Sequence, residues 1–235
     1  MTLVLYDLAG RDSSVRFSPY CWRIKMALAH KGLAHEARPW RFTDKAAIAQ
    51  AGSKTTPVIE HGGRWLGESW KIAAYLDATF PELPLMVSEA ERRLTRAFST
   101  WVDQNVLPAF ARQIVSDIPP ILNAADVSYF RESREARFGR PLHEVTADRD
   151  QTLPQLRQML APARVALENG GFLAGATPGY ADYVLFAAFQ WVRAVSARPL
   201  LAAGDPLDHW CRRMLDLYDG LAARAPVSHP ERLAL

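Results

Sequence analysis

The sequence is poor in cysteine, and its histidines are scattered. Its two cysteines, Cys21 and Cys211, lie far apart and form no disulfide framework, which suits a reducing cytosol. The six histidines show neither the HExxH spacing nor the cysteine pairing that zinc sites use. We therefore expect a cytoplasmic protein that does not depend on a metal.

Long apolar runs and strong charge are also missing. No stretch approaches the ~18 apolar residues that a membrane helix requires, and the nearest, 183–189, is far too short. The apolar run 3–6 ends at Asp7, without the basic start and longer hydrophobic segment of a secretory signal. The net charge is only +3, and the arginines of 131–149 are interleaved with acidic residues. The sequence therefore predicts neither membrane insertion nor nucleic-acid binding.

The first eighty residues alternate between strand and helix patterns. The expected elements, in order, are a strand at 2–8, a helix at 19–32, a strand at 36–42, a hairpin at 56–68 and a helix at 69–80. A variable segment separates the second strand from the hairpin, which turns at Gly62-Gly63. This β-α-β, β-β-α order predicts a compact α/β domain over residues 1–80.

The second part of the chain has helical periods. Residues 80–86, FPELPLM, contain two prolines and predict a linker, which we place at 81–88. Helical patterns then follow at 89–115, 125–138, 148–169, 180–195 and 206–224, before an irregular tail. We expect an all-α second domain over 89–235.

Residues 18–21, Ser-Pro-Tyr-Cys, open the first helix. Serine is a favoured N-cap and proline a favoured first residue, so the pair explains a helix start without any chemistry. A second interpretation is that the Ser18 hydroxyl stabilises a substrate thiolate. Lowering a thiol pKa by two units takes about 2.7 kcal/mol; the helix dipole supplies ~0.3–1 kcal/mol and a hydroxyl hydrogen bond about 1.5–3 kcal/mol. Both interpretations stay open, and Ser13 and Ser14 are alternative donors.

Cys21 occupies the place of the second cysteine in a Cys-Pro-Tyr-Cys dithiol motif, and Ser18 replaces the first cysteine. With Ser18 in that first position, no disulfide can form within the motif. One turn into the helix, Cys21 is expected to be buried and inert, and Tyr20, Ile24, Ala27 and Leu28 to form the apolar face. A thiol reductase that uses Cys21 is the alternative.

Two further residue pairs stand in the first half. Thr56-Pro57 opens the hairpin, and a cis bond there would turn the Thr56 backbone outward to pair with an extended peptide. Glu68-Ser69 starts a helix, either as a simple cap or as a site where Ser69 and the following amides hold a carboxylate while Glu68 holds an ammonium group. Such a site would recognise a free α-amino acid end.

Together these three pairs resemble the glutathione transferases, and the resemblance covers residues 2–224. It implies a thioredoxin-like N-terminal domain, an all-α C-terminal domain, glutathione as co-substrate and a homodimer. It also implies that Ser18 steadies the glutathione thiolate, that Thr56 pairs with the cysteinyl backbone, and that Glu68 and Ser69 hold the γ-glutamyl end.

The same resemblance suggests a contact for the glycine carboxylate. Lys45 lies where many members of the family place that contact, and Lys54 is a competitor.

One departure from the family is in the second domain, where Gly179 replaces the usual Ser, Thr or Asn cap that precedes an aspartate, here Asp182. Glycine is an acceptable cap, so we expect the fold to be unaffected.

Two segments narrow the resemblance. Residues 18–32 and 129–145, with the GYADY sequence at 179–183, are similar to the bacterial β-etherases and their fungal relatives. This implies attack of the glutathione thiolate on an aromatic electrophile, with cleavage of a β-aryl ether as a further expectation. A non-catalytic protein that stores aromatic ligands is the alternative. Candidates for the electrophile site are Trp101, Asn105, Phe110, Arg112, Tyr129, Phe130 and Arg134.

Overall fold

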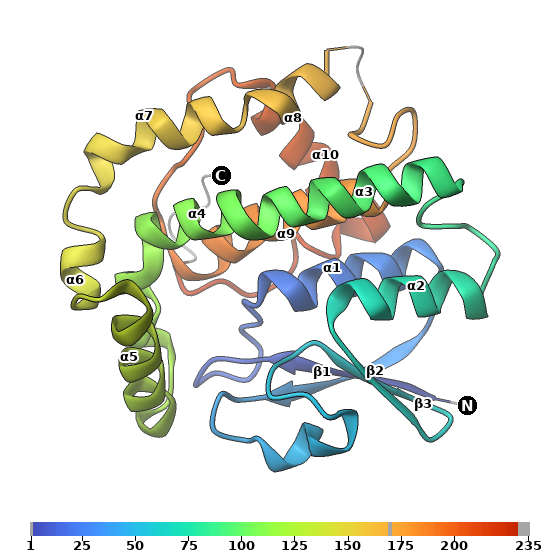
Figure 1. The fold of residues 1–235 in the computed structure, drawn as a ribbon, viewed down its shortest axis with the longest axis horizontal. Helices are drawn as coiled ribbons and strands as arrows, with labels where there is room; N and C mark the ends of the chain where they lie inside the picture. Colours follow the sequence, from blue (N-terminus) through green and yellow to red (C-terminus); the bar gives the residue numbers. More distant parts are fainter. Residues whose placement is uncertain (1, 169–170, 230–235) are drawn as a thin grey trace.

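The computed structural model describes residues 2–168 and 171–229. The last residue of the predicted helix 148–169 and the end of the predicted tail, 230–235, lie outside the described residues. The N-terminal half is a four-stranded mixed sheet of order β2-β1-β3-β4 (Figure 1). β1 (Leu3–Leu8) runs parallel to β2 (His35–Trp40) and antiparallel to β3 (Val58–His61), which pairs with β4 (Arg64–Gly67).

Two helices cover one face of this sheet. α1 (Pro19–His30) connects β1 to β2, and α2 (Ser69–Thr79) follows β4. In Figure 1 both helices lie between the sheet and the helices of the second half. The variable segment forms a short 3-10 helix, Ala46–Ala51, and Gly62-Gly63 makes the hairpin turn with φ of 59° and 81°. The predicted thioredoxin-like α/β domain is confirmed.

The second half is helical, as predicted. Its elements are α3 (Glu89–Trp101), a π-helical segment (Val102–Val106), α4 (Leu107–Ile114), 3-10 turns at Val115–Asp117 and Pro119–Ile121, α5 (Ala124–Phe138), α6 (Leu142–Val145), α7 (Arg149–Met159), α8 (Ala161–Ala166), α9 (Tyr180–Val195) and α10 (Pro206–Gly220). α6 was not expected from the sequence, and α10 ends at Gly220 instead of 224.

Prolines explain why two predicted helices are interrupted. The segment 89–115 widens into the π-helical turn just before Pro108, because proline has no N–H to continue the ladder, and the Leu107 N–H bonds to the Val102 carbonyl. The segment 148–169 breaks at Leu160, two residues before Pro162, and continues as α8. The sequence showed both prolines, but the helical period concealed the breaks.

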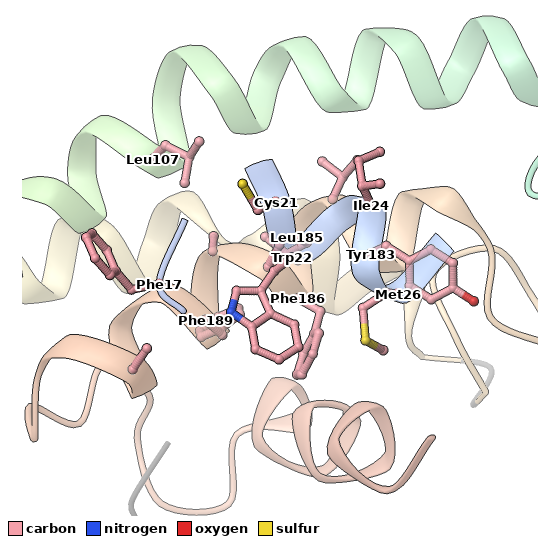
Figure 2. Close-up of a cluster of buried hydrophobic side chains, with 14 of the residues drawn as sticks. Phe17, Cys21, Trp22, Ile24, Met26, Leu107, Tyr183, Leu185, Phe186 and Phe189 are labelled. Carbon is pink, nitrogen blue, oxygen red and sulfur yellow. The ribbon is translucent and has the colours of Figure 1, made fainter. Parts of the chain in front are cut away.

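The two halves share a hydrophobic core. α1 packs along α9, and Trp22 and Met26 of α1 lie beside α9 side chains such as Phe186 (Figure 2). The predicted apolar face of α1 is correct except at Tyr20, which is 37% exposed. Tyr20 belongs to the first turn of α1. No helix of residues 2–168 and 171–229 is long and apolar enough to span a bilayer.

A buried carboxylate organises the start of α9. Asp182 accepts hydrogen bonds from the N–H groups of Leu173 (2.7 Å), Ala174 (3.1 Å) and Gly179 (3.0 Å), and from the Trp210 indole (2.9 Å). A Cβ at position 179 would lie 2.7 Å from the Ala174 methyl group, which explains why glycine stands at this cap. The departure noted in the sequence is therefore a packing requirement.

We predict that Asp182→Ala lowers the free energy of unfolding by about 3 kcal/mol or more, because four donors lose their acceptor in the core. Chemical denaturation of the variant and of Asp216→Ala measures the effect. Asp216 is an exposed residue of α10, so its variant should change stability by less than about 0.5 kcal/mol. Equal stability of the two variants would contradict this role.

Candidate active site

A cavity of about 770 Å³ lies between the α/β half and the helical half. The α/β half contributes the residues before and at the start of α1, the segment around Thr56, and the start of α2. The helical half contributes α3, the π-helical segment, α4, α5 and Trp191 of α9. Four of the predicted site residues line this cavity, namely Ser18, Thr56, Glu68 and Ser69. A thiol peptide at this place would meet groups from both halves.

Ser18 stands at the mouth of α1. It is the N-cap, with extended backbone (φ −69°, ψ 123°), and its Oγ accepts the N–H of Cys21 at 3.2 Å. The residue is 4% exposed and borders the cavity. A hydroxyl that accepts one hydrogen bond still has its own proton to donate. The cap interpretation and the thiolate interpretation are therefore compatible.

Cys21 lies behind Ser18, away from solvent. It is 0% exposed, and Figure 2 shows its sulfur within the buried cluster of α1, α4 and α9. Burial, together with the negative charge of Asp7, raises the pKa of the Cys21 thiol to about 12, and the Ser18 and Thr56 hydroxyls offset this only partly. Cys21 does not line the cavity. This geometry favours the inert interpretation of the cysteine over the reductase.

The two other residue pairs meet at the same cavity. The Thr56-Pro57 peptide bond is cis, which answers the question that the sequence left open. Glu68 has φ 67° and ψ 118°, a conformation that costs a residue with a side chain about 1–3 kcal/mol and is found most often at functional sites. Its carboxylate pairs with Lys71 Nζ at 2.6 Å, and both side chains are exposed.

Ser69 is the first residue of α2 and is tied to the helical half. Its carbonyl accepts the hydroxyl of Tyr180, the first residue of α9, at 3.0 Å. Tyr180 is buried, and burial raises the pKa of its hydroxyl to about 12, so the phenol stays protonated and donates. The start of α2 is therefore held in place by the start of α9.

The remaining candidates of the α/β half lie outside the cavity lining. Lys45 Nζ donates to the Lys54 carbonyl (2.9 Å) and to the Tyr129 hydroxyl (3.3 Å), and it sits over the Tyr129 ring at 4.7 Å. Ser13 and Ser14 are exposed, and Ser14 Oγ donates to Asp12 Oδ1 at 2.7 Å. Of the serines considered as thiolate donors, only Ser18 borders the cavity.

Helices α4 and α5 contribute part of the cavity lining in the helical half. Of the electrophile-site candidates, Arg112, Phe130 and Arg134 line it. Phe110 is fully buried against Phe189, at 5.1 Å between ring centroids. The other candidates that do not line it are Trp101, Asn105 and Tyr129.

Several lining residues were missed by the sequence analysis. They include Tyr20, Trp40, Trp70, Arg96, Asp103, Arg137 and Trp191. Two of these arginines, Arg96 and Arg137, lie on a helix three residues from another lining residue, Ser99 and Arg134 respectively. This spacing, which puts side chains on one helix face, is a signal that could have identified them.

The fold defines a class of protein, a thioredoxin-like domain joined to a helical domain, here with a cavity between them. The family model described as glutathione S-transferase, N-terminal domain, matches residues 17–79, and the model of the C-terminal domain matches residues 93–202. The chain belongs to the glutathione transferase superfamily.

Individual relatives agree with this assignment. The chain is 25% identical over 217 residues to glutathione S-transferase omega-1 of Mus musculus, covering 87% of this chain and 75% of that protein. A glutathione transferase of Phanerochaete chrysosporium, GSTFuA3, has a TM-score of 0.75 at 26% identity, covering 94% and 92% of the two chains. A glutathione S-transferase of Ceriporiopsis subvermispora, solved in complex with glutathione, has the same fold at 22% identity, with a TM-score of 0.75 over 96% and 95%.

We predict that the native protein has no reactive thiol at pH 8. Both cysteines are buried, and burial raises the pKa of each thiol, so the thiolate fraction stays negligible. Titration with a chromogenic disulfide should detect no thiol in the folded protein and two per chain in guanidinium. Rapid reaction of one thiol in native Cys211→Ala would show an accessible Cys21 and favour the reductase.

Proposed function

We propose that the protein is a glutathione transferase in which Ser18 stabilises the glutathione thiolate for attack on an aromatic electrophile. The observation that carries the proposal is the meeting of Ser18, Thr56 and Glu68-Ser69 at one cavity, although they come from three separate segments. The glutathione bound to the related structure from Ceriporiopsis subvermispora supports glutathione as the co-substrate.

Glutathione would extend across the surface of the α/β half. Its γ-glutamyl carboxylate would bind the Ser69 hydroxyl and the amides at the start of α2, and its ammonium group would bind Glu68. Its cysteinyl backbone would pair with Thr56, and its glycine carboxylate would lie towards Lys45. The sulfur would then reach the N-terminus of α1, where Ser18 is the N-cap.

Catalysis depends on the N-terminus of α1 favouring the thiolate form of glutathione over the thiol. The Ser18 hydroxyl donates its proton in a hydrogen bond to the sulfur anion, and the helix N-terminus adds a favourable potential. The thiol proton leaves to solvent. The thiolate then attacks an aromatic electrophile held among Phe42, Phe130 and the neighbouring arginines, and the leaving group departs with the bond electrons.

We further propose that the chemistry includes β-aryl ether cleavage. The arginines that line the cavity from α4 and α5 support this, because a guanidinium stabilises a departing phenolate. In this proposal residues 1–80 bind glutathione, 81–88 link the domains, and 89–235 hold the electrophile. A homodimer and a cytoplasmic location remain predictions of the sequence resemblance and of the cysteine content.

We predict that Ser18→Ala lowers kcat/KM for glutathione conjugation about 10- to 100-fold, because the thiolate loses one hydrogen bond worth about 1.5–3 kcal/mol. The dissociation constant for glutathione should change by less than about threefold, because the other contacts remain. Conjugation kinetics and calorimetry measure the two quantities.

The matched controls are Ser13→Ala and Ser14→Ala, which remove hydroxyls outside the cavity and should leave both quantities unchanged. Full turnover in Ser18→Ala with loss in either control would move the thiolate donor to that serine.

We also predict that the protein releases a phenol from a β-aryl ether of an aromatic ketone in the presence of glutathione. Chromatography detects the phenol and the glutathione conjugate in equal amounts, because one ether bond breaks for each thioether bond formed. If the protein conjugates aryl halides but releases no phenol from such ethers, its function is glutathione conjugation without ether cleavage.

A further inference from the structure

The charges that line the cavity do not balance. Four arginines line it, Arg96, Arg112, Arg134 and Arg137, against two acids. Both acids already have basic partners: Glu68 pairs with Lys71 at 2.6 Å, and Asp103 pairs with Arg23 at 2.6 Å. Among residues 2–168 and 171–229, no carboxylate lies within ion-pairing distance of the four arginines.

Among the described residues of the helical half, some arginines outside the cavity pair with an acid and others, such as Arg140, do not. The pairs include Arg149 with Asp117 (3.5 Å), Arg164 with Asp205 (2.7 Å), Arg198 with Asp150 (2.6 Å) and Arg212 with Asp208 (3.1 Å). The lack of counter-charges in the cavity therefore leaves room for an anion that arrives with a ligand.

The arginines occupy two ends of the cavity. Arg96 lies over the ring of Trp70 at 4.9 Å, next to Glu68-Ser69, the proposed site of the γ-glutamyl end. Arg134 lies over the rings of Phe42 (5.6 Å) and Phe130 (5.0 Å), at the aromatic end. Arg137 is on the same face of α5, and Arg112 approaches from α4.

Arg134 is the best placed of the three arginines from α4 and α5 to bind an anion. Its side chain is half-buried, and burial lowers the pKa of its guanidinium, which shows that desolvation is not compensated by a carboxylate. Of its five N–H donors, one bonds to the Ser133 hydroxyl at 3.0 Å, its only hydrogen bond with the described residues. The fork-shaped guanidinium binds carboxylates with two parallel hydrogen bonds.

We infer that the second substrate is an aromatic acid, whose ring lies against Phe42 and Phe130 and whose carboxylate binds Arg134, with Arg112 and Arg137 adding positive charge. The inference rests on the proposed function for the glutathione half of the reaction. It changes the expected substrate class from a neutral hydrophobic electrophile to an anionic aromatic one.

The test uses a dinitrobenzoate and the corresponding dinitrobenzamide, two unreactive ligands with the same ring that differ in charge. Calorimetry at low salt should give about tenfold tighter binding of the carboxylate. The preference should fall as salt is added, because ions screen the exposed arginines Arg112 and Arg137. Equal binding of the two ligands by the native protein would overturn the inference.

Variants assign the effect to the residue. Arg134→Gln should reduce the preference to about twofold or less, and Arg134→Lys should retain part of it, because lysine keeps the charge without the fork. Arg131→Gln is the matched control, since Arg131 is an exposed residue of α5 outside the cavity. If Arg134→Gln does not fold, the exposed Arg112→Gln should still lower the preference, by about twofold.

The anion that binds Arg134 has a second possible source, the glycine carboxylate of glutathione itself. If Arg134→Gln weakens glutathione binding about tenfold and leaves the benzoate preference intact, Arg134 belongs to the glutathione site and the inference is wrong. The ligand pair needs no turnover. A protein that prefers the benzoate but neither binds nor conjugates glutathione would therefore refute the proposed function, and only the binding of an aromatic acid at Arg134 would still stand.

Discussion

The hydrogen bond between the Cys21 N–H and Ser18 Oγ is the contact on which the rest of the site depends. This bond makes Ser18 the N-cap of α1 and fixes its side chain at the edge of the cavity. Because the oxygen acts there as an acceptor, its proton remains free for a ligand at the positive end of the helix. The same arrangement of this side chain is thus compatible with the structural cap and with the proposed role of thiolate donor.

Helix α9 supports that arrangement from the second half. Asp182 gathers the backbone before α9 and the Trp210 indole, while Tyr180, two residues earlier, holds the Ser69 carbonyl. α9 also packs along α1. The buried carboxylate determines where α9 begins and thereby supports the positions of α1 and α2.

Local chemistry explains what could be predicted from the sequence. Ser18 and Ser69 were identified because helix starts follow short-range rules for caps and prolines. The strands were identified from the pattern of apolar residues over a few neighbouring positions. The exposure of Tyr20 and the contact of Lys45 with Tyr129 depend on how distant segments meet. The interruption at Pro108 has a local cause, but the helical period concealed it. The cavity arginines were only partly predicted, because helical period alone does not say which face of α5 borders the cavity.

The central claim is that Ser18 lowers the pKa of a bound thiol, and the most direct measurement is the ultraviolet absorbance of the thiolate in the protein–glutathione complex as a function of pH. The account predicts a pKa about two units below the ordinary value of about 8.5 in the native protein, rising by at least one unit in Ser18→Ala. An identical pKa in the two proteins would contradict it.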